Sequence, residues 1–258
     1  MSFNKPVRPR ISFKAFRRLS GRNPDGWGVA FYPDRSAAVF KEPLEAGRSQ
    51  LAEFLERYEG LESKIFVAHV RRATVGERGA YRNTHPFCRE LFGREYVFAH
   101  NGTLRAFRAL ELGPFRPVGE TDSEHAFCHL LYRIQKRGVV EWGREDFDWL
   151  ANVLREISRR GAFNAIFSDG VHLFCYFDES GYNGMFFVRR KPPHGRLKLV
   201  DEDWEIDLSQ VKGPDEFGYV VATKRLTDEE WLELEPGELI VFRDGRMVYS
   251  SSGREEES

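Results

Sequence analysis

Three short blocks of the sequence carry the side chains best suited to chemistry: HVRRAT (69–74), AHNGTL (99–104) and GETDSEHAF (119–127). The first supplies the guanidinium of Arg71 and the hydroxyl of Thr74, the second supplies Asn101 beside Gly102, and the third supplies the carboxylate of Asp122. A guanidinium can grip a carboxylate with two parallel hydrogen bonds, and a carboxylate can hold an ammonium group. Together the blocks could bind both charged ends of a free α-amino acid and the carbonyl of its side chain.

Each of these residues also has an ordinary structural interpretation. An arginine at a strand end is most often a surface ion-pairing residue, Asn-Gly after a strand is most often a turn, and an aspartate at a helix start is most often an N-cap. In the functional interpretation, a turn at Asn101-Gly102 aims backbone N–H groups and the Asn101 amide at one developing oxyanion. The joint order of the three blocks favours this interpretation more than any one of them does.

Metal chemistry is not indicated by the sequence. His125 and His129 lie four residues apart on an expected helix, with Glu124 and Cys128 nearby. This order differs from the HExxH pattern, and no third ligand follows at an informative spacing. We therefore expect no metal and no cofactor.

Composition excludes several classes of partner. The 258 residues include 39 basic and 40 acidic residues, a balance that points to no nucleic-acid partner. No run of apolar residues is long enough to span a membrane and no apolar signal core is present, so we expect no membrane partner. Three widely spaced cysteines fit a reducing cytoplasm rather than a disulfide framework. The basic residues of segment 8–18 alternate with apolar ones, which indicates a solvated face beside a buried one.

Many expected strands and a few expected helices predict an α+β layered domain. The strands are expected at 27–33, 37–41, 64–70, 95–101, in several short pieces within 162–190, at 217–224, and as a hairpin over 238–250. The helices are expected at 48–60, 123–138 and 144–161. Although a boundary near residue 160 is conceivable, the strands on both sides fit one sheet system. We therefore expect a single domain over 1–258 that ends in a charged tail at 253–258.

The motifs taken together resemble a known family. They are NPDGWGVAFY (23–32), HVRRATVG (69–76), NTHPF (83–87), AHNGTL (99–104) and GETDSE (119–124). This set is similar to the glutaminase domain of the class II glutamine amidotransferases, above all to the small stand-alone members that lack a fused synthase. The resemblance continues more loosely through 220–242.

The resemblance implies a fold and a set of residue roles. The fold would be that of the N-terminal-nucleophile hydrolases, a four-layer αββα sandwich of two antiparallel sheets. Arg71 would bind the α-carboxylate of glutamine with Thr74 beside it, and Asp122 would bind the α-ammonium group. Asn101 and the N–H of Gly102 would stabilise the tetrahedral oxyanion. His85 of NTHPF would line the pocket, and Val75 replaces a histidine that many members carry.

The resemblance also implies a nucleophile that residues 1–258 do not contain. The family mechanism needs an N-terminal cysteine whose thiolate attacks the side-chain amide and whose α-amine serves as base. Relatives read Met-Cys, a few residues, and then a segment like MSFNKP, so we expect the true start about six residues upstream of Met1.

The missing cysteine leaves three alternatives open. The protein could be a natural cysteine-less relative that senses glutamine or a γ-glutamyl compound, or an interaction module. Alternatively Met1 could be removed so that Ser2 attacks, although Ser2 lies far along its strand from Asn101. The sequence names neither the acceptor nor a synthase partner. A free glutaminase, a γ-glutamyl hydrolase and a subunit of a complex all remain possible.

Overall fold

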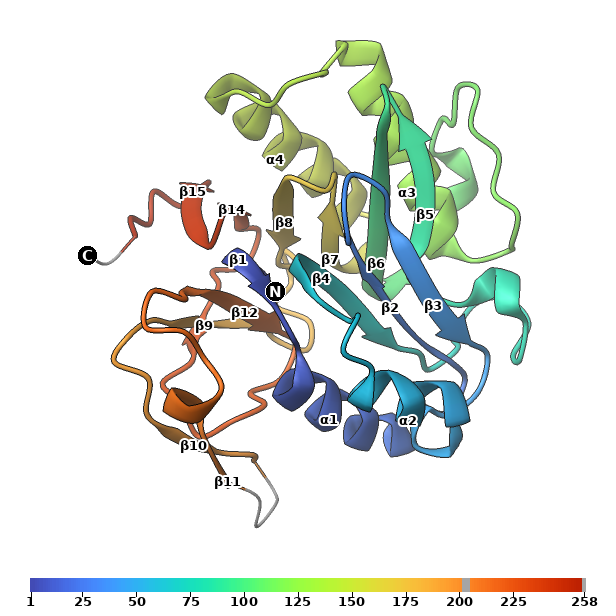
Figure 1. Cartoon of the computed structure of the whole chain (residues 1–258). Helices are drawn as coiled ribbons and strands as arrows, with labels where there is room; N and C mark the ends of the chain where they lie inside the picture. Colours follow the sequence, from blue (N-terminus) through green and yellow to red (C-terminus); the bar gives the residue numbers. More distant parts are fainter. Residues whose placement is uncertain (201–204, 257–258) are drawn as a thin grey trace.

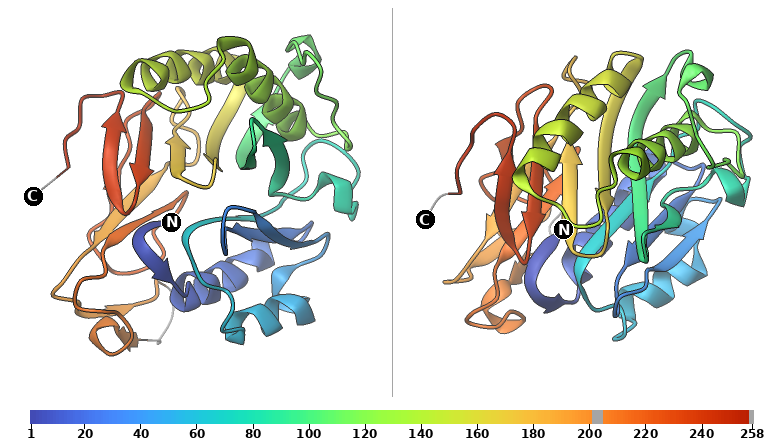
Figure 2. Two further views of the ribbon diagram at one scale, coloured as in Figure 1. Left: turned by 45° about the horizontal axis from the view of Figure 1, so that its top comes forward. Right: turned by 90° about the horizontal axis from the view of Figure 1, so that it is seen from above.

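The computed structural model describes residues 1–200 and 205–256, and these residues form four layers (Figures 1 and 2). Two antiparallel sheets lie face to face, and helices cover the outer face of each (Figure 2, left). The expected α+β fold with a four-layer αββα arrangement is therefore confirmed.

The first sheet has seven strands in the order β13-β9-β12-β1-β4-β2-β3. In chain order these are β1 (Ser2–Val7), β2 (Trp27–Phe31), β3 (Ala38–Glu42), β4 (Ser63–Val70), β9 (Phe186–Arg190), β12 (Gly218–Ala222) and β13 (Leu232–Glu233). Helices α1 (Arg10–Leu19) and α2 (Gln50–Arg57) cover its outer face (Figure 1). A separate two-stranded ribbon pairs β10 (Arg196–Lys198) with β11 (Glu205–Asp207).

The second sheet has six strands in the order β15-β14-β8-β7-β6-β5. These are β5 (Phe87–Leu91), β6 (Arg94–Leu104), β7 (Gly161–Ser168), β8 (His172–Tyr176), β14 (Leu239–Arg243) and β15 (Arg246–Ser250). Helices α3 (Asp122–Arg137) and α4 (Arg144–Ser158) cover it. The expected hairpin over 238–250 is confirmed, and it turns at Asp244-Gly245 with positive φ at both residues.

Three apolar clusters fill the three interfaces between the layers. One joins α1 and α2 to the first sheet and includes Phe13, Trp27 and Leu55. The middle one lies between the sheets and includes Val97 and Phe242. The third joins α3 and α4 to the second sheet. Because strands alternate their side chains, each sheet contributes to two of these clusters.

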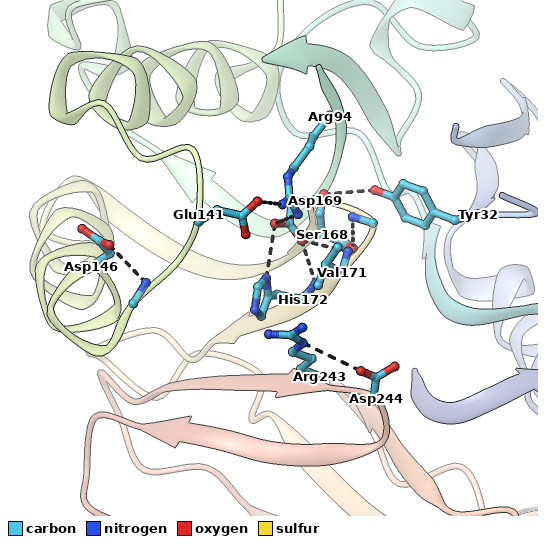
Figure 3. Close-up of polar contacts among 12 residues, drawn as sticks. Tyr32, Arg94, Glu141, Asp146, Ser168, Asp169, Val171, His172, Arg243 and Asp244 are labelled. Atoms are coloured by element: carbon cyan, nitrogen blue, oxygen red, sulfur yellow. Dashed lines mark hydrogen bonds and ion pairs between the residues drawn. The ribbon is translucent and has the colours of Figure 1, made fainter. Parts of the chain in front are cut away.

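The β7–β8 turn of the second sheet is fixed by a polar network (Figure 3). The Asp169 carboxylate accepts hydrogen bonds from the backbone N–H groups of Val171 at 3.0 Å and His172 at 2.6 Å. Arg94, the first residue of β6, forms an ion pair with Asp169 at 3.3 Å. Tyr32 reaches across from the first sheet and donates to the carbonyl of Ser168 at 3.1 Å. These contacts clamp one end of β6 and β7, whereas Asn101 lies seven residues farther along β6.

Several local predictions differ from the structure. Segment 8–18 was interpreted only as a basic surface beside a buried one, but it forms all of α1 except the last residue. Phe13 is buried there, and Arg17 pairs with Glu56 of α2. Strand β5 is absent from the predicted elements, and β1 was expected only as the strand that carries Ser2. The helix predicted at 48–60 is shorter, and Phe54 and Tyr58, which its apolar spacing assigns to the buried face, are exposed.

Candidate functional site

A cavity of about 490 Å³ opens between the two sheets at the ends of β4, β6 and β12 and the start of α3. Such a volume lies within the ordinary range for small-molecule sites. All six residues singled out from the sequence line it: Arg71, Thr74, His85, Asn101, Gly102 and Asp122. Four separate segments of the chain therefore converge on one pocket.

Arg71 follows the last residue of β4 and is only 3% exposed. Its backbone N–H donates to Gly26 and its carbonyl accepts from the N–H of Asp25, so the NPDGWG motif holds it in place. One terminal nitrogen of its guanidinium donates to the Val75 carbonyl at 3.1 Å, and the other is buried without a partner. Burial lowers the pKa of Arg71, while the carboxylates of Asp25 and Asp122 raise it. A buried cation with a free donor edge is suited to an anionic ligand group.

Asp122 is the first residue of α3 but not its cap. The hydroxyl of Thr121 accepts from the N–H of Glu124 at 3.1 Å and so caps the helix. Asp122, 3% exposed, accepts from the N–H of Leu104 on β6 at 2.7 Å, and the Ser123 hydroxyl lies 3.5 Å from its other oxygen. The N-cap interpretation of Asp122 is therefore wrong. The helix N-terminus instead supports a carboxylate that lines the pocket.

Asn101 and Gly102 do not form the expected turn, because β6 continues through both of them to Leu104. Asn101 faces Asn164 of β7 in the register, and Gly102 faces Phe163. Gly102 has φ +150°, and a Cβ there would lie 2.0 Å from the carbonyl oxygen of Ala162. A glycine is required because the neighbouring strand approaches too closely for any side chain.

Thr74 and His85 contribute to the pocket in different ways. Thr74 is exposed at the rim, and its hydroxyl lies 2.8 Å from that of Thr103. His85 is 4% exposed, and neither of its ring nitrogens has a hydrogen-bond partner. Its ring centre lies 4.3 Å from that of His69, with the two rings tilted by 49°. Burial, and then the neighbouring His69, push the pKa of His85 well below its usual value. His85 is therefore neutral at physiological pH.

No cysteine of the chain lines the pocket. Burial raises the pKa of Cys88 and of Cys128 to about 11, and that of Cys175 to about 12. Since the thiolate is the attacking form, all three are poor nucleophiles at neutral pH.

The other candidate groups also lie outside this chemistry. Ser2 is fully buried, its hydroxyl lies 3.4 Å from the N–H of Gly245, and it does not line the pocket. The ring nitrogens of His125 and His129 bond to the backbone carbonyls of Leu110 and Glu111. Within residues 1–200 and 205–256, no cluster of metal-binding side chains occurs and no helix is long and apolar enough to cross a bilayer.

Among the pocket residues that the sequence interpretation missed, Asn164, Tyr182 and Asn183 lie beside Asn101 or are bonded to its neighbours. Asn164 sits inside the apolar run AFNAIF, where a buried amide is unusual and could have been recognised as a signal. No comparable signal marks Asn183, because GYNG reads as an ordinary turn.

The family model described as "Glutamine amidotransferases class-II" matches residues 1–258. The chain belongs to the class II glutamine amidotransferases. It is 47% identical to protein MJ1515 of Methanocaldococcus jannaschii, over 96% of this chain and 69% of that one. It is 39% identical to Escherichia coli YafJ, which is named as a candidate glutamine amidotransferase, over 96% of this chain and 97% of YafJ.

A solved structure supports both the family and the fold. The crystal structure of a predicted glutamine amidotransferase from Pseudomonas aeruginosa PA01 superposes with a TM-score of 0.69 at 33% identity, covering 87% of each chain. The αββα arrangement expected from the motif resemblance is thus shared with a solved member of the family.

Proposed function

We propose that the pocket binds L-glutamine or a γ-glutamyl amide by its α-amino-acid end. The free edge of the buried Arg71 guanidinium takes the α-carboxylate, with the Thr74 hydroxyl at the rim beside it. Asp122 takes the α-ammonium group. The observation that carries this proposal is the presence of one buried cation and one buried carboxylate in the same pocket, each contributed by a different motif.

The side-chain carbonyl of the bound substrate would then face Asn101 and Gly102. An N–H of the Asn101 amide and the backbone N–H of Gly102 would stabilise the oxyanion that forms when a nucleophile attacks that carbonyl. In the mechanism that the family implies, a thiolate attacks, ammonia or an amine leaves, and a γ-glutamyl thioester forms. Water then hydrolyses the thioester to release glutamate and regenerate the thiol.

We further propose that the attacking thiolate belongs to a cysteine that precedes Met1, on an N-terminal extension of strand β1. Ser2 pairs with Tyr219 and Phe3 pairs with Gly218 in antiparallel register. Residues added before Met1 would continue along β12 toward Ala222 and Thr223, both of which line the pocket. A cysteine presented in this way would reach the pocket, whereas Cys88, Cys128 and Cys175 do not line it.

The test compares two forms of the protein by calorimetry and by ammonia release. Residues 1–258 should bind L-glutamine without hydrolysing it, since none of their three cysteines lines the pocket. A form in which about six residues headed by a processed N-terminal cysteine precede Met1 should also release ammonia, and its Cys→Ser variant should bind without turnover.

Two results would count against the proposal. If residues 1–258 hydrolyse glutamine and Ser2→Ala abolishes this, the serine acts as the nucleophile instead. If the form that begins with cysteine neither binds nor cleaves any γ-glutamyl compound tried, the chain shares the fold of the family but not its activity. The interpretation as an interaction module would then replace that of an enzyme.

A further inference from the structure

The Asn101 amide can serve an oxyanion only if its NH₂ group, and not its oxygen, faces the substrate. An amide has a donor end and an acceptor end of nearly equal size, so a neighbouring group must decide which end points into the pocket. The structure supplies such a neighbour. The side-chain NH₂ of Asn183 donates to the side-chain oxygen of Asn101 at 3.1 Å.

Asn183 is held in place by the loop that joins β8 to β9. The Asp178 carboxylate organises this loop: it accepts from the N–H of Ser180 at 2.9 Å and from the Ser180 hydroxyl, and it anchors the loop to the N–H of Phe163 on β7 at 2.9 Å. Asn183 adopts φ +59° at the tip of this loop. Burial alone would raise the pKa of Asp178, but the hydrogen bonds from Ser180, Phe163 and their neighbours lower it, so the anchor is ionised.

A second contact joins the same loop to the strand beside Asn101. Asn164 faces Asn101 directly in the β6–β7 register. Its NH₂ donates to the carbonyl of Tyr182 at 2.7 Å, and its oxygen accepts from the N–H of Asp178 at 3.0 Å. Both ends of the Asn164 amide are therefore engaged by the loop. The loop is thus tied to the second sheet immediately beside the pair formed by Asn101 and Asn183.

We propose that Asn183 is a positioning residue that sets the orientation of the Asn101 amide. By donating to the oxygen of Asn101, it leaves the NH₂ of Asn101 on the opposite edge of the planar amide, available to the substrate carbonyl. The inference rests on the proposed role of Asn101 as an oxyanion donor. It goes beyond that role because it assigns the orientation of the Asn101 amide to the β8–β9 loop, which Asp178 and Asn164 hold in place.

Two substitutions separate this role from a merely structural one. Asn183→Gly removes the amide, and Asn183→Asp keeps its shape while reversing its hydrogen bonding; both replacement residues tolerate a positive φ. The carboxylate introduced by Asn183→Asp would accept from Asn101 and turn its NH₂ out of the pocket. The positioning role therefore predicts a greater effect for Asn183→Asp than for Asn183→Gly. If Asn183 only supports the loop, the isosteric aspartate should be the milder change.

The first experiment uses the unliganded protein and needs no substrate. In ¹⁵N–¹H NMR spectra, Asn183→Gly should shift and broaden the side-chain NH₂ signals of Asn101, because the amide can then rotate. Asn152→Ala, an exposed change on α4, serves as the control and should leave these signals unmoved. If the Asn101 signals are the same in Asn183→Gly as in the wild type, the proposal is overturned.

The second experiment compares the affinity of L-glutamine with that of L-norvaline, which has the same α-amino-acid end but no side-chain carbonyl. Asn183→Asp should reduce the preference for glutamine by about 3- to 10-fold, the value of one neutral hydrogen bond, and leave norvaline affinity unchanged. Equal loss for both ligands, or an unchanged preference, would contradict the positioning role. If the wild type binds neither amino acid, the proposed function fails, whereas the NMR comparison still decides the role of Asn183.

Discussion

Replacing Arg71 tests the centre of the proposed site. The guanidinium is 3% exposed, and one of its terminal nitrogens has no hydrogen-bond partner in the protein. Arg71→Ala removes the basic side chain proposed to bind the α-carboxylate. Truncating one member of a buried, hydrogen-bonded charge pair costs about 2–5 kcal/mol of binding free energy. We therefore expect the Kd for L-glutamine to rise by about 30- to 5000-fold.

Two companion variants show whether this loss reflects the contact itself. Arg71→Lys keeps the charge but not the two-pronged geometry, so it should weaken binding by an intermediate factor of about 10. Arg105→Ala removes an equal charge at an exposed position just beyond β6, outside the pocket, and should leave the Kd unchanged. Isothermal titration calorimetry would measure all three variants against the wild type.

The folded state of each variant must be verified alongside its affinity. Asp25 and Asp122 both raise the pKa of Arg71, so the alanine variant leaves two carboxylates without that cation and should unfold at a lower temperature. Circular dichroism melts identify variants that are still folded at the titration temperature. If folded Arg71→Ala and Arg71→Lys bind glutamine as tightly as the wild type does, the amino-acid end does not bind at Arg71 and the reasoning is refuted.

Three further predictions concern stability. Gly102→Ala should lower the free energy of unfolding by about 2 kcal/mol or more, because its Cβ would overlap a β7 carbonyl oxygen. The control, Gly79→Ala, is also at positive φ but in open space, so it should lower the free energy of unfolding by only about 1 kcal/mol. Urea unfolding measures both variants. Burial lowers the pKa of His69 from 6.5 to about 3. Below pH 6.5 His69 therefore binds a proton in the unfolded chain but not in the folded one. The free energy of unfolding should decrease as the pH is lowered, by about 2 kcal/mol between pH 6.5 and pH 5. His69→Gln should remove the share of this dependence that His69 contributes, measured by urea unfolding at each pH, whereas the share of His85, whose pKa is also lowered, should remain. Asp178→Asn should lower the free energy of unfolding by about 1–3 kcal/mol and so lower the melting temperature, because an NH₂ group would face N–H groups that now donate to the carboxylate. An unchanged melting temperature would contradict this.

The long, strongly patterned elements were predictable from the sequence. The α3 and α4 helices and the β14–β15 hairpin lie within a few residues of their expected bounds, because periodic apolar residues and turn residues agree there. The β5 strand was missed because its sequence, FCREL, contains no β-branched residue, whereas the equally short β3 was predicted. The α1 helix was missed for a different reason: its many basic residues masked the apolar spacing of Phe13 and Phe16.

The sequence predicted which motif residues line the pocket but not how they are arranged in it. Arg71, Asn101 and Asp122 could be recognised because each lies in a motif of the family. The sequence gives no register between β6 and β7, so it could not show that Asn101 faces Asn164 or that β6 runs straight through Gly102. Only the register places Asn164 beside Asn101, and only the folded loop brings Asn183 to within hydrogen-bond distance of it.

The positions of the two networks suggest how rigidity is divided along β6 and β7. At one end, Asp169 and Arg94, which do not line the pocket of Asn101, fix the β7–β8 turn (Figure 3). At the other end, the strands carry Asn101 and Asn164, which bind the Asp178 loop instead. A donor that must meet a developing charge has to be held within a few tenths of an ångström. A short loop that is hydrogen-bonded to both strands can hold Asn101 in this way and still leave one face of its amide open to the substrate.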